Sequence, residues 1–304
     1  HWEATVLSLL FTVFAVATTA IVIYGAYFGG ITALLLRSMF FSTVSAAGLV
    51  LVGSRFANPA IRIFCYALAA FAVVPGIHLY NSYFDIIMRG AMSTALEQAA
   101  VDPEVRVVLL RGSEGVFTAG NDLGDFMKNP PSSLDSPVGR FLKVLVEFPK
   151  PIVVAVEGAA IGVGTTMLLH CDLVYAAEGT RFALPFTTLG LSPEAASTVL
   201  LPLLCGRLRA SELLLFGEKF DTNVAREIGL VNAVLAPEAL HAHAQQRAAA
   251  LAALPPASVR ATKRLMGDAQ RAAVHEALVR EGEVFFERLR SPEAAEAMQA
   301  FFER

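Results

Sequence analysis

The sequence predicts an α/β domain over residues 89–304 that follows an all-α, strongly apolar segment over residues 1–88. Two observations carry this prediction. Between residues 4 and 84 the only charged side chains are Arg37, Arg55 and Arg62, whereas charges come at ordinary density after Asp85. From about residue 91 short apolar runs alternate with stretches of helical spacing, an order typical of a parallel-rich α/β core.

Composition excludes several classes of function. The chain has 304 residues and a net charge of -3, and it carries no basic stripe, so no nucleic-acid partner is expected. Cys65, Cys171 and Cys205 lie far apart without metal or redox spacing, which favours a reduced compartment. The six histidines form no chelating pair on a clear helix, and no metal site is expected.

Three long apolar runs make up the first segment, over residues 5–28, 31–52 and 61–80. A helix needs roughly 20 such residues to cross a bilayer. The sequence therefore predicts three transmembrane helices, a lipid bilayer as partner, and a membrane-associated protein whose α/β domain lies in the cytoplasm. A buried soluble helical hairpin is the alternative. A signal peptide is a single short apolar run, so three runs in series do not fit one.

Periodicity places the elements of the α/β domain. Short β-branched and leucine runs predict buried strands over 106–111, 152–156 and 173–177. Helical spacing covers 92–100, 141–148 and 165–170, and the chain is mostly helical from residue 211 onward. This divides the domain into a core over 92–235 and a C-terminal helical part over 236–304.

Two glycine-bearing loops, 117–122 and 158–164, each follow a predicted strand. Backbone N–H groups at a loop that opens into a helix are unpaired and can point at a ligand oxygen. Two such groups that converge form an oxyanion hole, which stabilises the enolate of a thioester. Taken alone, a glycine turn after a strand is more often just a turn.

The loops and their neighbours resemble the crotonase (enoyl-CoA hydratase/isomerase) superfamily. Residues 117–122 read Phe-Thr-Ala-Gly-Asn-Asp, 149–158 read Pro-Lys-Pro-Ile-Val-Val-Ala-Val-Glu-Gly, 162–164 read Gly-Val-Gly and 171–176 read Cys-Asp-Leu-Val-Tyr-Ala. Residues 217–232 complete the order, which agrees with the family from about 92 to 304. The resemblance implies a crotonase-like ββα superhelix, an acyl-CoA substrate in fatty acid metabolism, no separate cofactor, and a homotrimer or hexamer.

The resemblance also implies the roles of individual residues. The oxyanion donors are the backbone N–H groups of Ala119 and Val163. Lys263 is similar to a family lysine that meets the phosphate or adenine end of coenzyme A, although a solvated helix lysine is an equally good interpretation. The other residues expected to contact substrate are Thr118, Gly120, Asn121, Asp122, Gly162, Gly164, Thr166, Phe186 and Leu191.

Glu194 is the predicted catalytic base. The two glutamates of the hydratases are absent, because Thr166 stands at one position and residues 184–186 read Leu-Pro-Phe at the other. Glu194, in the segment Leu-Gly-Leu-Ser-Pro-Glu of residues 189–194, is similar to the single glutamate of the Δ3,Δ2-enoyl-CoA isomerases. One carboxylate suffices to move a proton from C2 to C4. The alternative is that Glu194, which follows Pro193, is an N-terminal residue of a helix without a catalytic role.

Two further functions stay open at this point. One is hydration or another crotonase-type acyl-CoA reaction. The other is an inactive acyl-CoA-binding module attached to a membrane segment.

Family members begin with a β-hairpin ahead of the first helix, and here the apolar segment stands in its place. We therefore expect a fold that lacks the first hairpin, which exposes a sheet edge and part of the coenzyme A site. Fold alone does not guarantee activity.

Overall fold

The computed structural model describes residues 81–112, 115–128, 130–131 and 133–303. From Ser82 onward these residues belong to one compact unit. The three apolar runs predicted to cross a membrane, and the position where the family hairpin would stand, lie outside the described residues. Within residues 81–303, excepting the gaps just given, no helix combines the length and the apolar character that a membrane span requires.

A four-stranded parallel sheet forms the centre of the α/β domain, in the order β1-β2-β4-β6. Its strands are β1 (Val108–Arg111), β2 (Ile152–Val156), β4 (Leu173–Ala177) and β6 (Ala233–Leu235). The strands predicted over 152–156 and 173–177 are confirmed with the same bounds, and the run over 106–111 forms the shorter β1. Since β1 pairs only with β2 among the described strands, it lies at the edge of the sheet.

A second, two-stranded parallel sheet joins β3 (Ala159–Ile161) and β5 (Arg181–Ala183). Thr118 extends it through an isolated bridge to Ala160. This sheet was not predicted, because its strands are three residues long and one lies inside a glycine-rich loop. It brings the two glycine-bearing loops into contact.

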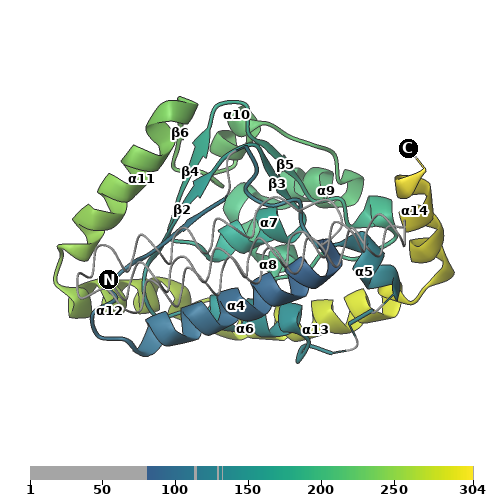
Figure 1. Cartoon of the computed structure of the whole chain (residues 1–304), viewed down its shortest axis with the longest axis horizontal. Helices are drawn as coiled ribbons and strands as arrows, with labels where there is room; N and C mark the ends of the chain where they lie inside the picture. Colours follow the sequence, from purple (N-terminus) through teal and green to yellow (C-terminus); the bar gives the residue numbers. More distant parts are fainter. Residues whose placement is uncertain (1–80, 113–114, 129, 132, 304) are drawn as a thin grey trace, which may run out of the picture. The chain divides into compact units, whose positions relative to one another are not determined.

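The two faces of the main sheet bury different layers, as the pleat of a strand requires. Val153 and Ala155 of β2 pack with Leu240 and Ala244 of α11 (Pro237–Ala252). Figure 1 shows α11 lying along β2, β4 and β6. The alternate residues of β2, such as Val154, face the larger core that the remaining helices complete. The site described below lies on this second side.

Helices account for most of the rest of the domain. They are α4 (Asn81–Val101), α5 (Leu123–Lys128), α6 (Pro137–Glu147), α7 (Val163–Thr166), α8 (Ser197–Cys205), α9 (Arg207–Phe216), α10 (Thr222–Glu227), α12 (Pro256–Asp268), α13 (Arg271–Leu289) and α14 (Pro292–Phe302), with 3-10 turns η2 (Met167–His170) and η3 (Thr187–Leu189). The helix predicted over 165–170 is thus divided between α7 and η2. Helices α11 to α14 occupy the C-terminal part of the domain.

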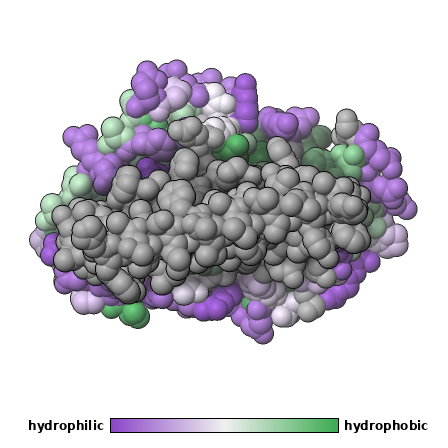
Figure 2. Space-filling view, viewed as in Figure 1, coloured by the Kyte–Doolittle hydropathy of each residue, from purple (hydrophilic) through white to green (hydrophobic). Residues whose placement is uncertain are grey.

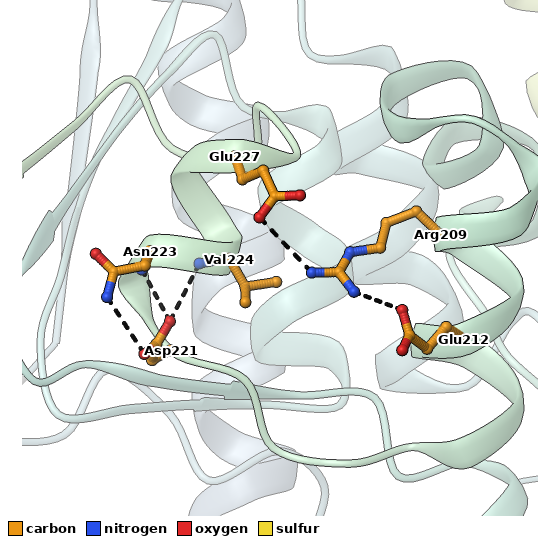
Figure 3. A network of polar contacts seen from close by, with 6 residues as sticks. All are labelled: Arg209, Glu212, Asp221, Asn223, Val224 and Glu227. Atoms are coloured by element: carbon orange, nitrogen blue, oxygen red, sulfur yellow. Dashed lines mark hydrogen bonds and ion pairs between the residues drawn. The ribbon is translucent and has the colours of Figure 1, made fainter.

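An ion pair joins α9 to α10, as Figure 3 shows. Arg209 of α9 lies between Glu212, at 2.5 Å, and Glu227 of α10, at 3.8 Å. Asp221 caps α10 by accepting hydrogen bonds from the amides of Asn223 and Val224. These partly exposed pairs contribute to the orientation of the two helices more than to stability.

Candidate active site

The two glycine-bearing loops lie against each other. The Thr118 amide donates to the Ala159 carbonyl at 2.9 Å, and the Ile161 amide donates to the Thr118 carbonyl at 3.1 Å. At Gly120, where φ is +90°, a Cβ would lie 2.8 Å from the Ile161 carbonyl oxygen. At Gly164 a Cβ would lie 2.3 Å from the Thr118 Cγ2 atom. Glycine at 120 and 164 therefore permits this close approach.

The amides predicted to form the oxyanion hole come from these two loops. In the part of the chain that the structure describes, neither the Ala119 nor the Val163 amide donates a hydrogen bond to a protein acceptor. Their neighbours do: the Gly162 amide donates to the Ala183 carbonyl at 2.9 Å, and the Gly120 amide to the Thr118 hydroxyl at 3.1 Å. The Ala119 and Val163 N–H groups are thus available for a ligand, and their role stays a prediction.

Glu194 lies in the loop between η3 and α8 and is 7% exposed. The hydroxyl of Thr166, at the end of α7, donates a hydrogen bond to the Glu194 Oε1 atom. Thr166 is fully buried. The structure therefore places Thr166, which was expected to contact substrate, against the predicted base and not on the wall of the cavity described next.

A small cavity of about 30 Å³ adjoins Glu194. Among the described residues that line it, Glu194 is the only titratable one. Asn121 lines it too, and its Oδ1 atom is buried without a hydrogen-bond partner in the described residues. Such a cavity holds about one water molecule, whereas ligand pockets occupy roughly 300–1,000 Å³. An acyl chain can therefore enter only if the elements around the cavity move apart.

Sequence reasoning missed most of the cavity wall. It consists of apolar side chains of α5, α6 and α13, of which only Phe126 lies close in sequence to a glycine-bearing loop: Phe126, Val138, Leu142, Leu278, Phe285 and Phe286, with Pro131, Leu134, Ser136, Gly139, Ala195 and Gly282 completing the lining. On α13 the spacing of residues 278, 282 and 285 matches one helix face. That signal does not distinguish a cavity wall from ordinary core, so the sequence could not identify it.

The turn after Glu194 has an unusual backbone. Ala195 and Ala196 have φ values of 59° and 55°, and both are fully buried. L-residues rarely adopt this left-handed conformation, so surrounding contacts must maintain it. The Ser197 hydroxyl donates to the Glu194 carbonyl at 2.6 Å, and the His170 Nε2 atom lies 2.8 Å from the Ala195 carbonyl. Burial lowers the pKa of His170, which favours the neutral ring as donor to that carbonyl.

Some residues that were predicted to contact substrate do not line the cavity beside Glu194. Phe186 and Leu191 are buried in the core and do not line the cavity beside Glu194. Lys263 pairs with Asp172, its Nζ atom 2.7 Å from Oδ2, and also donates to the Lys150 carbonyl at 2.9 Å. It borders a separate cavity of about 550 Å³. The contact of Lys263 with coenzyme A stays a prediction.

Comparison with known proteins shows which family the chain resembles. The enoyl-CoA hydratase/isomerase family matches residues 81–304. Enoyl-CoA delta isomerase 2 of Rattus norvegicus is 32% identical over 231 residues, which are 74% of this chain and 57% of that protein. The 2,3-dehydroadipyl-CoA hydratase of Escherichia coli K12 is 32% identical over 210 residues, 69% of this chain and 82% of that protein.

Solved structures share the same architecture. The structure of Pseudomonas aeruginosa OdaA has a TM-score of 0.70 and 45% identity, and the match covers 72% of this chain and 89% of that one. The chain spans little more than half of the length of the rat delta isomerase, 57%, so that protein's activity as a whole does not transfer by similarity alone. The family match, the relatives and the shared fold together show that the chain belongs to the enoyl-CoA hydratase/isomerase, or crotonase, family.

Proposed function

We propose that the chain isomerises a 3-enoyl-CoA to the 2-enoyl-CoA, with Glu194 as the base that moves the proton. The observation that carries this proposal is the small apolar cavity, whose only titratable lining residue in the described part of the chain is Glu194. Thr166 stands where the resemblance to hydratases would place a second carboxylate. Its hydroxyl donates to Glu194 and supplies no base of its own.

The proposed reaction balances with one carboxylate. Glu194 takes the proton from C2, and the electron pair of that C–H bond delocalises over the thioester and the C3–C4 double bond as a dienolate. The Ala119 and Val163 amides would hold the negative thioester oxygen. Protonated Glu194 then returns its proton at C4, so the double bond lies between C2 and C3 and the base is restored. No water is consumed, in keeping with a cavity lined mainly by apolar side chains.

The direct test supplies the purified full chain, in detergent, with a 3-enoyl-CoA and follows the absorbance of the conjugated product. We expect turnover by the wild type and a fall in kcat of about 10²- to 10⁴-fold for Glu194→Gln, the usual contribution of general acid–base catalysis. Glu178→Gln, at an exposed carboxylate, is the matched control. Full activity of Glu194→Gln would exclude the mechanism.

A hydratase activity is the second candidate, because one of the similar proteins bears the name of a 2,3-dehydroadipyl-CoA hydratase. Hydration adds water across the C2–C3 bond and thus consumes the conjugated thioester. Incubation with a 2-enoyl-CoA separates the two reactions, since hydration gives a product heavier by one water molecule, whereas reversal of the isomerisation leaves the mass unchanged. If the chain binds acyl-CoA by calorimetry and turns over neither substrate, both of these activities are excluded, and the result favours the third alternative, an inactive binding module.

A further inference from the structure

The N-terminus of α8 is held by a carboxylate from a distant helix. Glu281 of α13 is 6% exposed, and its Oε1 atom accepts hydrogen bonds from the Thr198 amide, at 2.9 Å, and from the Thr198 hydroxyl, at 2.5 Å. Thr198 is the second residue of α8 and lies four residues after Glu194. The contact therefore ties α13 to the short turn that carries the proposed base.

A buried carboxylate such as that of Glu281 has an unfavourable free energy of desolvation, which a purely structural role does not explain. Burial raises its pKa, and the hydrogen bonds from Thr198 and the Ala196 amide only partly offset this effect. In the described part of the chain no lysine, arginine or histidine forms an ion pair with Glu281, and its Oε2 atom has no hydrogen-bond partner. A buried carboxylate of this kind usually contributes less to stability than an apolar side chain of similar size.

The turn that Glu281 holds is the one that needs support. Ala195 and Ala196 both have left-handed backbone conformations, and each is fully buried. The His170 ring also contacts this turn, at the Ala195 carbonyl. Glu281 thus restrains the turn on the α13 side, immediately after Glu194. A rotation of Ala195 or Ala196 to ordinary φ values would redirect the Glu194 side chain away from Thr166.

The same helix covers the cavity. Leu278, Gly282 and Phe285 of α13 line it, and Gly282 follows Glu281 directly. Because the cavity holds only about one water molecule, substrate entry requires movement of elements such as α13. A residue of α13 that also holds the turn after Glu194 couples the position of this helix to the orientation of the base.

We propose that Glu281 is a positioning residue, which fixes the turn of residues 195–198 and thereby holds Glu194 in its reactive orientation when α13 lies over the cavity. This inference rests on the proposed isomerase function. It adds a residue outside the cavity, on the C-terminal helices, to the machinery of the same site.

The test compares Glu281→Leu, Glu281→Gln and, as a matched control on the exposed face of α13, Glu283→Gln. Glu281→Leu keeps the side-chain volume but removes the acceptors, so we expect kcat to fall at least tenfold with KM changed less than threefold. Glu281→Gln keeps an acceptor for Thr198, and its kcat should stay within about threefold of the wild type. Glu283→Gln should resemble the wild type.

Amide hydrogen exchange provides a readout that does not depend on activity. Peptides covering residues 195–198 should exchange faster in Glu281→Leu than in Glu281→Gln, with the central sheet unchanged. If residues 195–198 exchange faster in Glu281→Leu and the wild type has no isomerase activity, the isomerase function is rejected and the restraint of the turn by Glu281 is retained. The proposed role of Glu281 would be overturned if Glu281→Leu has the kcat of the wild type, or if residues 195–198 exchange at equal rates in Glu281→Leu and Glu281→Gln. If Glu281→Leu does not fold, Thr198→Val takes its place with the same expectations.

Discussion

At the scale of single residues, the contact between Glu194 and Thr166 explains why a threonine suits this position. A hydroxyl has one proton to donate, and an ionised carboxylate can only accept. The Thr166 hydroxyl also lies 3.4 Å from the Val163 carbonyl and 3.5 Å from the Gly162 carbonyl. It can therefore donate to Glu194 while that group is ionised, and turn to a carbonyl of α7 once Glu194 has taken a proton.

This leads to a prediction for Thr166→Val, which keeps the shape but removes the hydroxyl. A hydrogen bond to a charged group contributes about 1.5–3 kcal/mol, so we expect kcat for the 3-enoyl-CoA to fall about 10- to 100-fold with little change in KM. Thr166→Ser, which retains the donor, should recover most of the rate. Steady-state kinetics of both variants decides the matter, and equal rates for valine and serine would show that the hydroxyl has no role.

Cys171 provides a second prediction at this scale. Burial is the main cause that raises the pKa of its thiol to about 12. At pH 8 only about one thiol in ten thousand is then ionised, and the thiolate is the reactive form. We expect iodoacetamide to label Cys171 very slowly in the native protein and readily in guanidinium chloride, as followed by peptide mass spectrometry. Cys205, which is less buried, should react faster than Cys171 in the native state. Equal native rates would contradict this account.

At the scale of elements, the contact between α7 and the strand-like segment at Thr118 determines where the two loop amides lie. Gly164 is helical, so alanine there meets no backbone strain, and the obstacle is the Thr118 Cγ2 atom, 2.3 Å from the added Cβ. The next nearest atom, the Thr118 carbonyl oxygen, would lie 3.3 Å away. The spacing of these elements therefore depends on one methyl group.

We expect Gly164→Ala to separate the loops, to cost about 1–3 kcal/mol of folding free energy and to lower kcat. Adding Thr118→Ser removes Cγ2 but keeps the hydroxyl that accepts from the Gly120 amide, so the double variant should regain stability and activity. Urea unfolding and steady-state kinetics of the wild type, the single variants and the double variant form a double-mutant cycle. Additive losses, with no recovery in the double variant, would show that the methyl contact does not control this spacing.

At the scale of the whole molecule, the sequence was most informative where a local pattern determines the structure. β2 is a run of buried apolar residues between Pro151 and Gly158, β4 is a similar run that ends shortly before Gly179, and the bounds of both were predicted correctly. β3 and β5 were missed, because a three-residue strand has no readable period. Glu194 was singled out by family resemblance, but its contact with Thr166 and the covering of its cavity by α13 depend on tertiary packing, which no local pattern specifies.

Among the described residues, helix α9 carries exposed apolar side chains as well as buried ones. The coloured surface in Figure 2 is largely hydrophilic, with smaller hydrophobic areas among it. On α9 the inner face buries Leu213 and Leu214, while Leu208, Leu215 and Phe216 are 88%, 67% and 64% exposed. Large apolar side chains that gather on one exposed surface often mark a contact with another molecule. Self-association of the chain through α9 would bury this face.

We therefore expect the full chain to form a homo-oligomer in detergent through α9. Leu208→Glu combined with Leu215→Glu should shift the mass measured by light scattering towards the monomer, because charges at a buried contact between copies are costly. Leu265→Glu, at a residue of α12 that is 66% exposed, is the matched control and should leave the mass unchanged. If instead the α12 variant dissociates the oligomer while the α9 variant does not, the interface includes α12 and does not depend on the exposed face of α9.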